Sequence, residues 1–140
     1  FIFNVQNYEG AQKKLNLHLT QRSCDCTLGL PYNIAGYSFL LHLISKLTNI
    51  PVGKFAHSIV DAHIYTCKED GSMAEYDHVP NLKEQIKREP KKLPALKISD
   101  EIKTLNDVYK TMKLPTAKIL EIYKLTNYNH HPKVTFKVAI

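Results

Sequence analysis

The stretch Leu15-Asn16-Leu17-His18-Leu19-Thr20 alternates apolar and polar side chains with a period of two, which predicts a half-buried β-strand. Phe1–Val5 is a second short apolar run, and Asn7–Gln12 between them is typical of a turn, so the two runs predict a hairpin. Downstream, apolar residues recur at spacings of three and four from Pro31 to about Thr48, which predicts a long amphipathic helix. We therefore expect a strand that leads into this helix to form the centre of the fold.

The remaining segments continue the mixture of strands and helices. Further strands are predicted over Phe55–Tyr65, which reads as buried, and over Leu93–Ile98, Ala117–Lys124 and Val134–Ala139. Shorter helices are predicted over Pro80–Arg88, with Leu82 and Ile86 facing inward, and near Glu101–Met112, and Thr66–Asp77 reads as a surface loop. Because strands and helices are mixed without strict alternation, the pattern favours an α+β fold with a mixed sheet.

Composition is that of a globular protein. The chain has 140 residues, of which 44% are hydrophobic and 23% are charged, which is enough for one domain over residues 1–140 with one core. Its 19 Lys+Arg exceed its 13 Asp+Glu, so the net charge of +6 favours anionic partners. The lysines are dispersed and are not interleaved with aromatic residues, so a phosphate-bearing small molecule is favoured over nucleic acid.

Cysteine usage indicates a reducing compartment. The three cysteines leave one unpaired thiol, and Cys24 and Cys26 are too close for an ordinary disulfide, so we expect core thiols in a cytoplasmic protein. Neither Cys24-x-Cys26 nor His130-His131 has the ligand spacing of a zinc site, and we expect no metal. No apolar run approaches the ~20 residues of a membrane span, and we expect no membrane association.

The stretch Gln21-Arg22-Ser23-Cys24-Asp25 follows the first long strand and combines two groups that suit phosphate. Arg22 offers a planar fork of donors, and the Ser23 hydroxyl adds another. The commoner meaning of such a stretch is a surface arginine beside turn-forming residues, and both interpretations stay open on these residues alone.

Two further groups of polar residues could bind a ligand. Asn33, within Leu28-Gly29-Leu30-Pro31-Tyr32-Asn33, carries a donor and an acceptor that match a uracil-like edge, although such residues more often cap a helix. Gly29 would let a ring or a backbone approach closely. Asp61, His63 and Tyr65 share one face of a strand, where they form either a buried hydrogen-bond network or a ligand site.

In order and spacing, these motifs resemble those of the thymidylate synthase family. The resemblance continues through Leu82-Lys83-Glu84-Gln85-Ile86-Lys87-Arg88-Glu89-Pro90 and Tyr128-Asn129-x-His131-Pro132, and it ends at Val138-Ala139-Ile140. It covers nearly all of the chain but only the C-terminal half of a usual family member. It implies a mixed β-sheet flanked by helices, with dimerisation through the sheet face.

The resemblance implies a binding site for deoxyuridylate. Arg22 and Ser23 would hold the phosphate, and Asn33 would read the uracil edge and act in catalysis. His63 and Tyr65 would bind the 3′-hydroxyl of the deoxyribose.

It also implies an adjoining folate site. Asp25 would lie between the nucleotide and the folate as a second catalytic residue, touching the uracil through its backbone and the pterin ring through its carboxylate. Leu28, Gly29 and Tyr32 would border the folate, and Ala139 with the terminal carboxylate would close over it. The cosubstrate would be methylenetetrahydrofolate, without a metal.

The family's reaction is the reductive methylation of deoxyuridylate to thymidylate, with dihydrofolate as the second product. Its nucleophilic cysteine belongs to a Pro-Cys-His motif upstream of the position that matches Phe1, so Cys24, Cys26 and Cys67 do not take its place. Because the chain begins with Phe1 and not with Met, we expect it to be half of a longer enzyme, which the resemblance implies is a homodimer. A deoxyuridylate hydroxymethylase and a non-catalytic nucleotide-binding domain are the alternatives.

Three features depart from the family pattern. Val60 stands where a glycine is usual, which puts the local packing beside the pocket in doubt. The loop at Lys68–Val79 and the turn near Tyr8–Lys13 look expanded.

Overall fold

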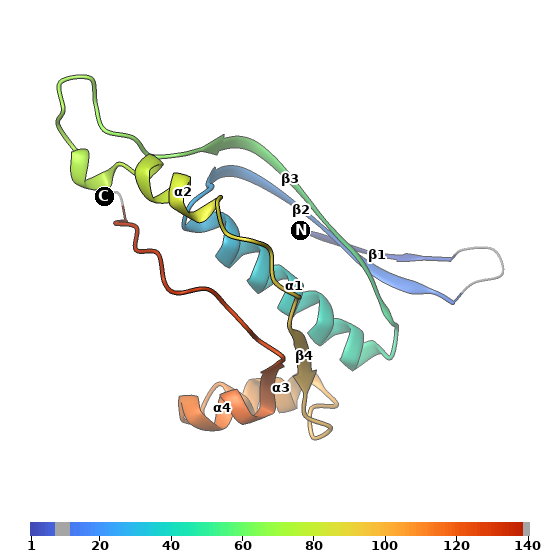
Figure 1. The fold of residues 1–140 in the computed structure, drawn as a ribbon. Coiled ribbons are helices and arrows are strands. Elements are labelled where there is room, and N and C mark those ends of the chain that lie inside the picture. Colours follow the sequence, from blue (N-terminus) through green and yellow to red (C-terminus); the bar gives the residue numbers. More distant parts are fainter. Residues whose placement is uncertain (8–11, 139–140) are drawn as a thin grey trace.

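The computed structural model describes residues 1–7 and 12–138, which form the predicted α+β fold of a mixed sheet with helices (Figure 1). A three-stranded sheet has the order β1-β2-β3, and a separate two-stranded sheet joins β4 to β5. No helix in these described ranges is long and apolar enough to cross a lipid bilayer.

The predicted hairpin strands are present. β1 (Ile2–Gln6) pairs antiparallel with β2 (Lys14–Asp25), and Ile2 lies opposite His18. β2 is longer than its alternating stretch and continues through the whole candidate phosphate motif, which was expected to leave the strand. The turn predicted over residues 7–12 falls mostly on residues 8–11, outside the described residues.

A long helix connects β2 to a parallel neighbour. α1 (Gly29–Thr48) begins two residues before the predicted start at Pro31, and β3 (Val52–His63) then runs parallel to β2. Phe55–Tyr65 was expected to be a buried strand, but β3 is an edge strand whose side chains alternate between half-buried and exposed. Val60 is 76% exposed, so its bulk meets little resistance from packing.

The main apolar core lies between α1 and one face of the three-stranded sheet. It consists of the alternating leucines of β2 and one leucine of the helix, namely Leu15, Leu17, Leu19 and Leu41. The period of two in β2 therefore supplies one wall of the core, and the helical period of α1 supplies the other.

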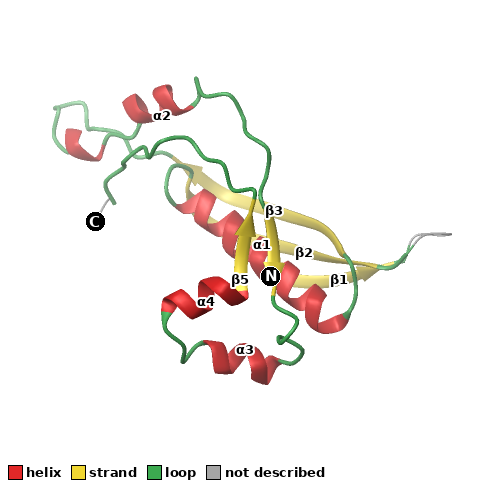
Figure 2. Cartoon of the chain, turned by 60° about the horizontal axis from the view of Figure 1, so that its bottom comes forward, coloured by secondary structure: helices red, strands yellow, loops and turns green. Residues whose placement is uncertain are grey.

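The opposite side of α1 covers a second unit (Figure 2). There β4 (Ala95–Ile98) pairs antiparallel with β5 (Tyr123–Thr126), and α3 (Leu105–Thr111) and α4 (Thr116–Ile122) lie between them in sequence. A second cluster joins this unit to the helix through Leu43, Ile102 and Ile122.

The strand predicted over Ala117–Lys124 is wrong for most of its length, because α4 occupies Thr116–Ile122. Its inward residues are Ile119 and Ile122, three apart as on a helix. Within the predicted region Glu101–Met112, α3 begins only at Leu105, because Thr104 and Asp107 form a reciprocal capping box.

The segment after β3 is mostly exposed, as predicted, and contains a short 3₁₀ helix, η1 (Ala74–Tyr76). α2 (Val79–Gln85) follows and ends earlier than the predicted Arg88. Ile86 therefore lies beyond the helix and is 78% exposed, so the prediction that it faces inward is wrong.

The strand predicted over Val134–Ala139 is also wrong, since residues 134–138 have no regular secondary structure and pair with no strand among the described residues. Backbone carbonyls near the C-terminus accept hydrogen bonds from side chains in and after α2: Arg88 Nη1 donates to Pro132 O at 2.6 Å, and Asn81 Nδ2 donates to Thr135 O at 2.8 Å. These bonds hold the C-terminal segment beside α2 without forming a sheet (Figure 1).

Candidate functional site

The predicted site residues gather at one end of the β2–α1–β3 unit. β2 ends at Asp25, α1 begins at Gly29, and parallel β3 ends at His63, so two strand ends and a helix start lie together. The register places Ser23 opposite Asp61 and Asp25 opposite His63. Carboxyl ends of parallel strands are where open α/β sheets bind ligands, so this edge is the candidate site.

The first contacts at this edge centre on the Asp61 carboxylate. Ser23 Oγ donates to Asp61 Oδ2 at 3.5 Å, and His63 Nδ1 lies 3.5 Å from the same oxygen. The Nδ1 atom is buried and has no hydrogen-bond partner of good geometry in the described chain. The parallel pairing of β2 with β3 thus brings the motif around Ser23 and the motif around Asp61 together in one polar cluster.

Arg22 stands apart from this cluster. It is exposed, whereas Ser23 is half-buried, because consecutive strand residues project from opposite faces. None of the ion pairs among the described residues involves Arg22. The guanidinium is therefore available to an anion, but the structure does not bring it beside the Ser23 hydroxyl.

Asp25 holds the turn between β2 and α1. Its Oδ1 accepts from Thr27 N at 2.9 Å and from Thr27 Oγ1 at 2.5 Å, and its Oδ2 accepts from Leu28 N at 3.1 Å. Burial alone would raise the pKa of the Asp25 carboxyl, but these bonds and a further one from Gly29 outweigh burial and lower that pKa. The carboxylate is therefore engaged by its own turn before any ligand arrives.

Asn33 is oriented by a chain of side-chain hydrogen bonds. Gln21 Nε2 donates to Asn33 Oδ1 at 3.1 Å and also to Ser23 O at 2.8 Å, while His57 Nε2 contacts Gln21 Oε1 at 3.0 Å. Because Gln21 donates to Oδ1, the Asn33 amide turns its oxygen, and not its nitrogen, toward Gln21. Cys24 Sγ also donates weakly to Oδ1 at 3.8 Å, so the half-buried amide offers chiefly Nδ2 to a ligand.

The residues predicted to border a folate line the start of α1. A Cβ added at Gly29 would lie 3.5 Å from Asp25 Cβ and 3.7 Å from Asn33 Oδ1, which are ordinary contact distances, so a side chain there would fill the gap between two predicted site residues. Leu28 is half-buried, and Tyr32 is 76% exposed. Ala139 lies outside the described residues.

Tyr65 follows β3 and extends the polar row of Asp61 and His63. Its ring meets the His63 ring edge-on at 5.3 Å and the His78 ring at 5.7 Å. The predicted row is therefore kept beyond the end of the strand by aromatic contacts.

Three residues near the site are absent from the sequence-based prediction. His57 supports Gln21, and Thr27 and His78 form a buried pair with 2.6 Å between Thr27 Oγ1 and His78 Nδ1. Thr27 is 6% exposed and His78 is 1% exposed. The separation of 51 residues gives this pair no periodic signal, and the only local hint was a histidine at the start of a helix.

The cysteines fit a structural role. Cys24 is 1% exposed, and burial raises the pKa of its thiol, with Cys26 and Asp25 raising it further. A thiol with a raised pKa is a poor nucleophile at neutral pH. Cys26 is half-buried and Cys67 is exposed, so the prediction of core thiols is correct for Cys24 and only partly correct for Cys26.

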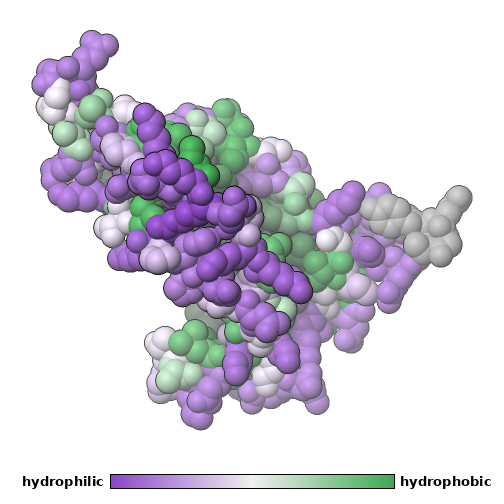
Figure 3. Space-filling view, in the orientation of Figure 1, coloured by the Kyte–Doolittle hydropathy of each residue, from purple (hydrophilic) through white to green (hydrophobic). Residues whose placement is uncertain are grey.

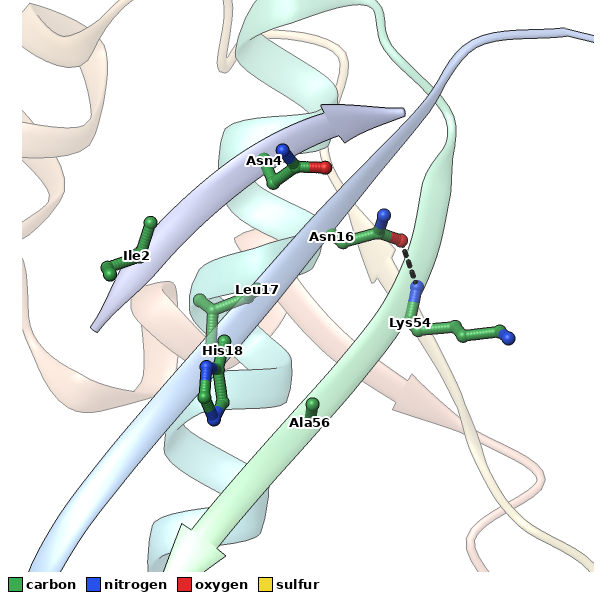
Figure 4. Close-up of a pocket in the computed structure, with 7 residues that line it drawn as sticks. All are labelled: Ile2, Asn4, Asn16, Leu17, His18, Lys54 and Ala56. Carbon is green, nitrogen blue, oxygen red and sulfur yellow. Dashed lines mark hydrogen bonds between the residues drawn. The ribbon is translucent and has the colours of Figure 1, made fainter. Parts of the chain in front are cut away.

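One surface depression of about 340 Å³ lies away from this edge (Figure 4). It is on the sheet face turned from α1, where Asn16 Oδ1 accepts from Lys54 N at 2.7 Å. Its lining residues are Ile2, Asn4, Asn16, Leu17, His18, Lys54 and Ala56. None is a predicted site residue, and this shallow surface offers no charged cluster for chemistry. No group of three metal-ligating side chains occurs within residues 1–7 and 12–138.

Comparison with known proteins gives a consistent result. The sequence model described as thymidylate synthase matches residues 1–140. The thymidylate synthase of Saccharomyces cerevisiae is 36% identical over 133 residues, which are 94% of this chain and 37% of that protein. The thymidylate synthase of Mycoplasma mobile is 38% identical over 140 residues, which are 100% of this chain and 40% of that protein.

A solved structure agrees in fold. Thermostable thymidylate synthase A from Bacillus subtilis superposes with a TM-score of 0.72 at 30% identity, covering 99% of this chain and 41% of that one. The chain therefore spans about two fifths of the length of the relatives that it matches.

Proposed function

The chain belongs to the thymidylate synthase family, and from that premise we propose that it forms the nucleotide- and folate-binding part of a deoxyuridylate methylase. The observation that supports this most is the gathering of Ser23, Asp25, Asn33 and His63 at one end of the β2–α1–β3 unit. Residues 1–140 would be the C-terminal half of one catalytic domain, in a cytoplasmic homodimer.

In this proposal the nucleotide lies along the ends of β2 and β3. The exposed Arg22 side chain swings over the end of β2 when the nucleotide binds, so that its guanidinium and the Ser23 hydroxyl hold the phosphate dianion together, for which a fork of charged donors is suited. Asn33 binds O4 and N3–H of the uracil, held in orientation by Gln21. His63 and Tyr65 bind the deoxyribose.

Methylenetetrahydrofolate lies against the start of α1. Leu28 and Tyr32 supply apolar surface, and the absence of a side chain at Gly29 leaves room beside Asn33. Asp25 contacts the uracil through its backbone. Its Oδ1 accepts two hydrogen bonds from Thr27 and its Oδ2 accepts one from Leu28, so Oδ2 is the oxygen that contacts the pterin. The folate supplies the one-carbon unit and the hydride, and a thiolate from outside these residues activates C5 of the uracil by attack at C6.

The proposal is tested with the natural protein by titration calorimetry with deoxyuridylate and deoxycytidylate. Gln21→Glu removes the donor that orients Asn33 while keeping size, so the amide must turn its nitrogen toward position 21. We expect the dissociation constant for deoxyuridylate to rise by about tenfold, as loss of one half-buried hydrogen bond of about 1.4 kcal/mol requires. Gln12→Glu makes the same change at an exposed position and should leave affinity unchanged.

Product analysis with methylenetetrahydrofolate then separates the possible reactions. Thymidylate and dihydrofolate in equal amounts support the proposal. 5-Hydroxymethyl-deoxyuridylate with tetrahydrofolate would identify the hydroxymethylase. Nucleotide binding without any product would indicate a binding domain, and equal affinity in both glutamate variants would contradict the assignment of Asn33.

A further inference from the structure

Three hydrogen bonds in series connect the Asp25 turn to the C-terminal segment. Asp25 Oδ1 lies 2.5 Å from Thr27 Oγ1, Thr27 Oγ1 lies 2.6 Å from His78 Nδ1, and His78 Nε2 lies 2.8 Å from Lys137 O. The series joins the loop after β2, the residue before α2, and the extended segment at residues 134–138. The main core does not include any of these groups.

The number of protons in this series is constrained. The Lys137 carbonyl only accepts, so His78 Nε2 must carry a proton. The single Thr27 hydroxyl proton can serve Asp25 or His78 but not both. All three bonds form together only when one further proton is present, on Nδ1 of His78 or on Asp25.

Aromatic rings enclose the buried side chain of His78. It is 1% exposed, and the Tyr65 and Phe136 rings meet it edge-on at 5.7 Å and 5.2 Å. The Asp25 carboxylate reaches it through Thr27, and the carboxylate of the preceding residue, Asp77, accepts from Val79 N at 3.0 Å. The one nearby cation, among the described residues in contact, is Lys137, whose ammonium is paired with Glu75.

We propose that His78 is a positioning residue that, through the Thr27 hydroxyl, ties the Asp25 turn to the C-terminal segment. Its bearing on catalysis rests on the proposed function, in which Asp25 lies between nucleotide and folate. The three hydrogen bonds themselves do not depend on that function. Through His78 they connect the C-terminal segment to the turn that begins α1.

The test is hydrogen exchange of the natural protein without ligands, read by mass spectrometry for residues 25–29 and 134–138. Thr27→Val keeps the volume and removes the hydroxyl, and Thr27→Ser restores it. We expect exchange of both segments to rise about fivefold in the valine variant, the factor carried by a hydrogen bond of ordinary net strength, and to recover with serine. Thr66→Val, at an exposed threonine, is the matched control.

Two substitutions at His78 separate the two halves of the tie. Asn places its amide near the position of Nδ1, so His78→Asn should keep the turn protected and release residues 134–138. Gln reaches toward the position of Nε2, so His78→Gln should hold residues 134–138 and loosen residues 25–29. A purely structural role would loosen both segments equally in both variants, and that outcome overturns the proposal.

A second readout separates the tie from the folate assignment. If exchange behaves as expected but the KM for folate is the same in both threonine variants, the tie stands and the folate assignment of Asp25 fails.

Discussion

At the scale of single residues, hydrogen bonding decides what each polar side chain can offer a ligand. Gln21 bonds Asn33, so the Asn33 amide has a defined orientation before any uracil arrives. Asp25 is bonded by Thr27 and Leu28, so its carboxylate first stabilises the start of α1. The same residue types on a free surface would offer neither constraint.

The bonded state of Asp25 predicts a loss of stability in acid. Its pKa is lowered in the folded protein, so its contribution is present above the unfolded value and is lost as pH falls through the folded one. We expect the urea midpoint of the natural protein to drop below about pH 4, and Asp25→Asn to reduce that drop. Glu69→Gln, at an exposed carboxylate, is the control. An equal acid loss in wild type and Asp25→Asn would contradict the hydrogen-bonded role.

At the scale of elements, the parallel pairing of β2 with β3 builds the site. The register shifts between Leu15 and Leu17, where Asn16 Oδ1 accepts from Lys54 N at 2.7 Å. This irregularity sets the phase of the ladder that later places Ser23 opposite Asp61. The pairing at the start of β3 therefore determines which residues lie opposite each other at its other end, where the candidate site is.

Gly53 is required by this irregularity. A Cβ at Gly53 would lie 2.1 Å from Asn16 Oδ1 and 3.0 Å from the Leu15 carbonyl oxygen, and neither atom moves freely because the first is bonded to Lys54 and the second is backbone. Gly53→Ala should therefore destabilise the protein by about 1–3 kcal/mol, measured by urea unfolding. Gly36→Ala, where no atom lies within 4 Å, should not destabilise it. Equal stability of both variants would show that the ladder start tolerates a side chain.

At the scale of the whole molecule, α1 is shared between two apolar clusters while much apolar surface stays uncovered. Leu41 faces the three-stranded sheet, and Leu43 faces the β4–β5 unit. Figure 3 shows apolar patches among polar side chains on the face that it presents, and Leu93 is 86% exposed. Clustered exposed apolar surface favours association.

As an isolated polypeptide, residues 1–140 are therefore predicted to be poorly stable or to self-associate. Analytical ultracentrifugation of this segment should give a broad distribution of sizes, whereas the natural protein should give one species. The contradicting outcome is a single 16.0 kDa species that melts cooperatively.

Local patterns account for the elements that were predicted correctly. The alternation at Leu15–Thr20 and the helical period of α1 are properties of adjacent side chains, and each corresponds to one wall of the core. Where apolar residues suit both periods, as in α4, the local pattern predicted a strand and packing selected a helix. The strand predicted over Val134–Ala139 is absent from residues 134–138, because the Thr135 carbonyl bonds the Asn81 side chain and not a neighbouring strand.

The sequence by itself determined the family, the α+β class and the motifs that carry the candidate site. Only the tertiary structure decided which of these residues act on one another: Asp61 with Ser23, Gln21 with Asn33, and Thr27 with His78. The physical reason is that a periodic pattern records which face a side chain takes, whereas a hydrogen bond across 51 residues depends on how separate elements pack.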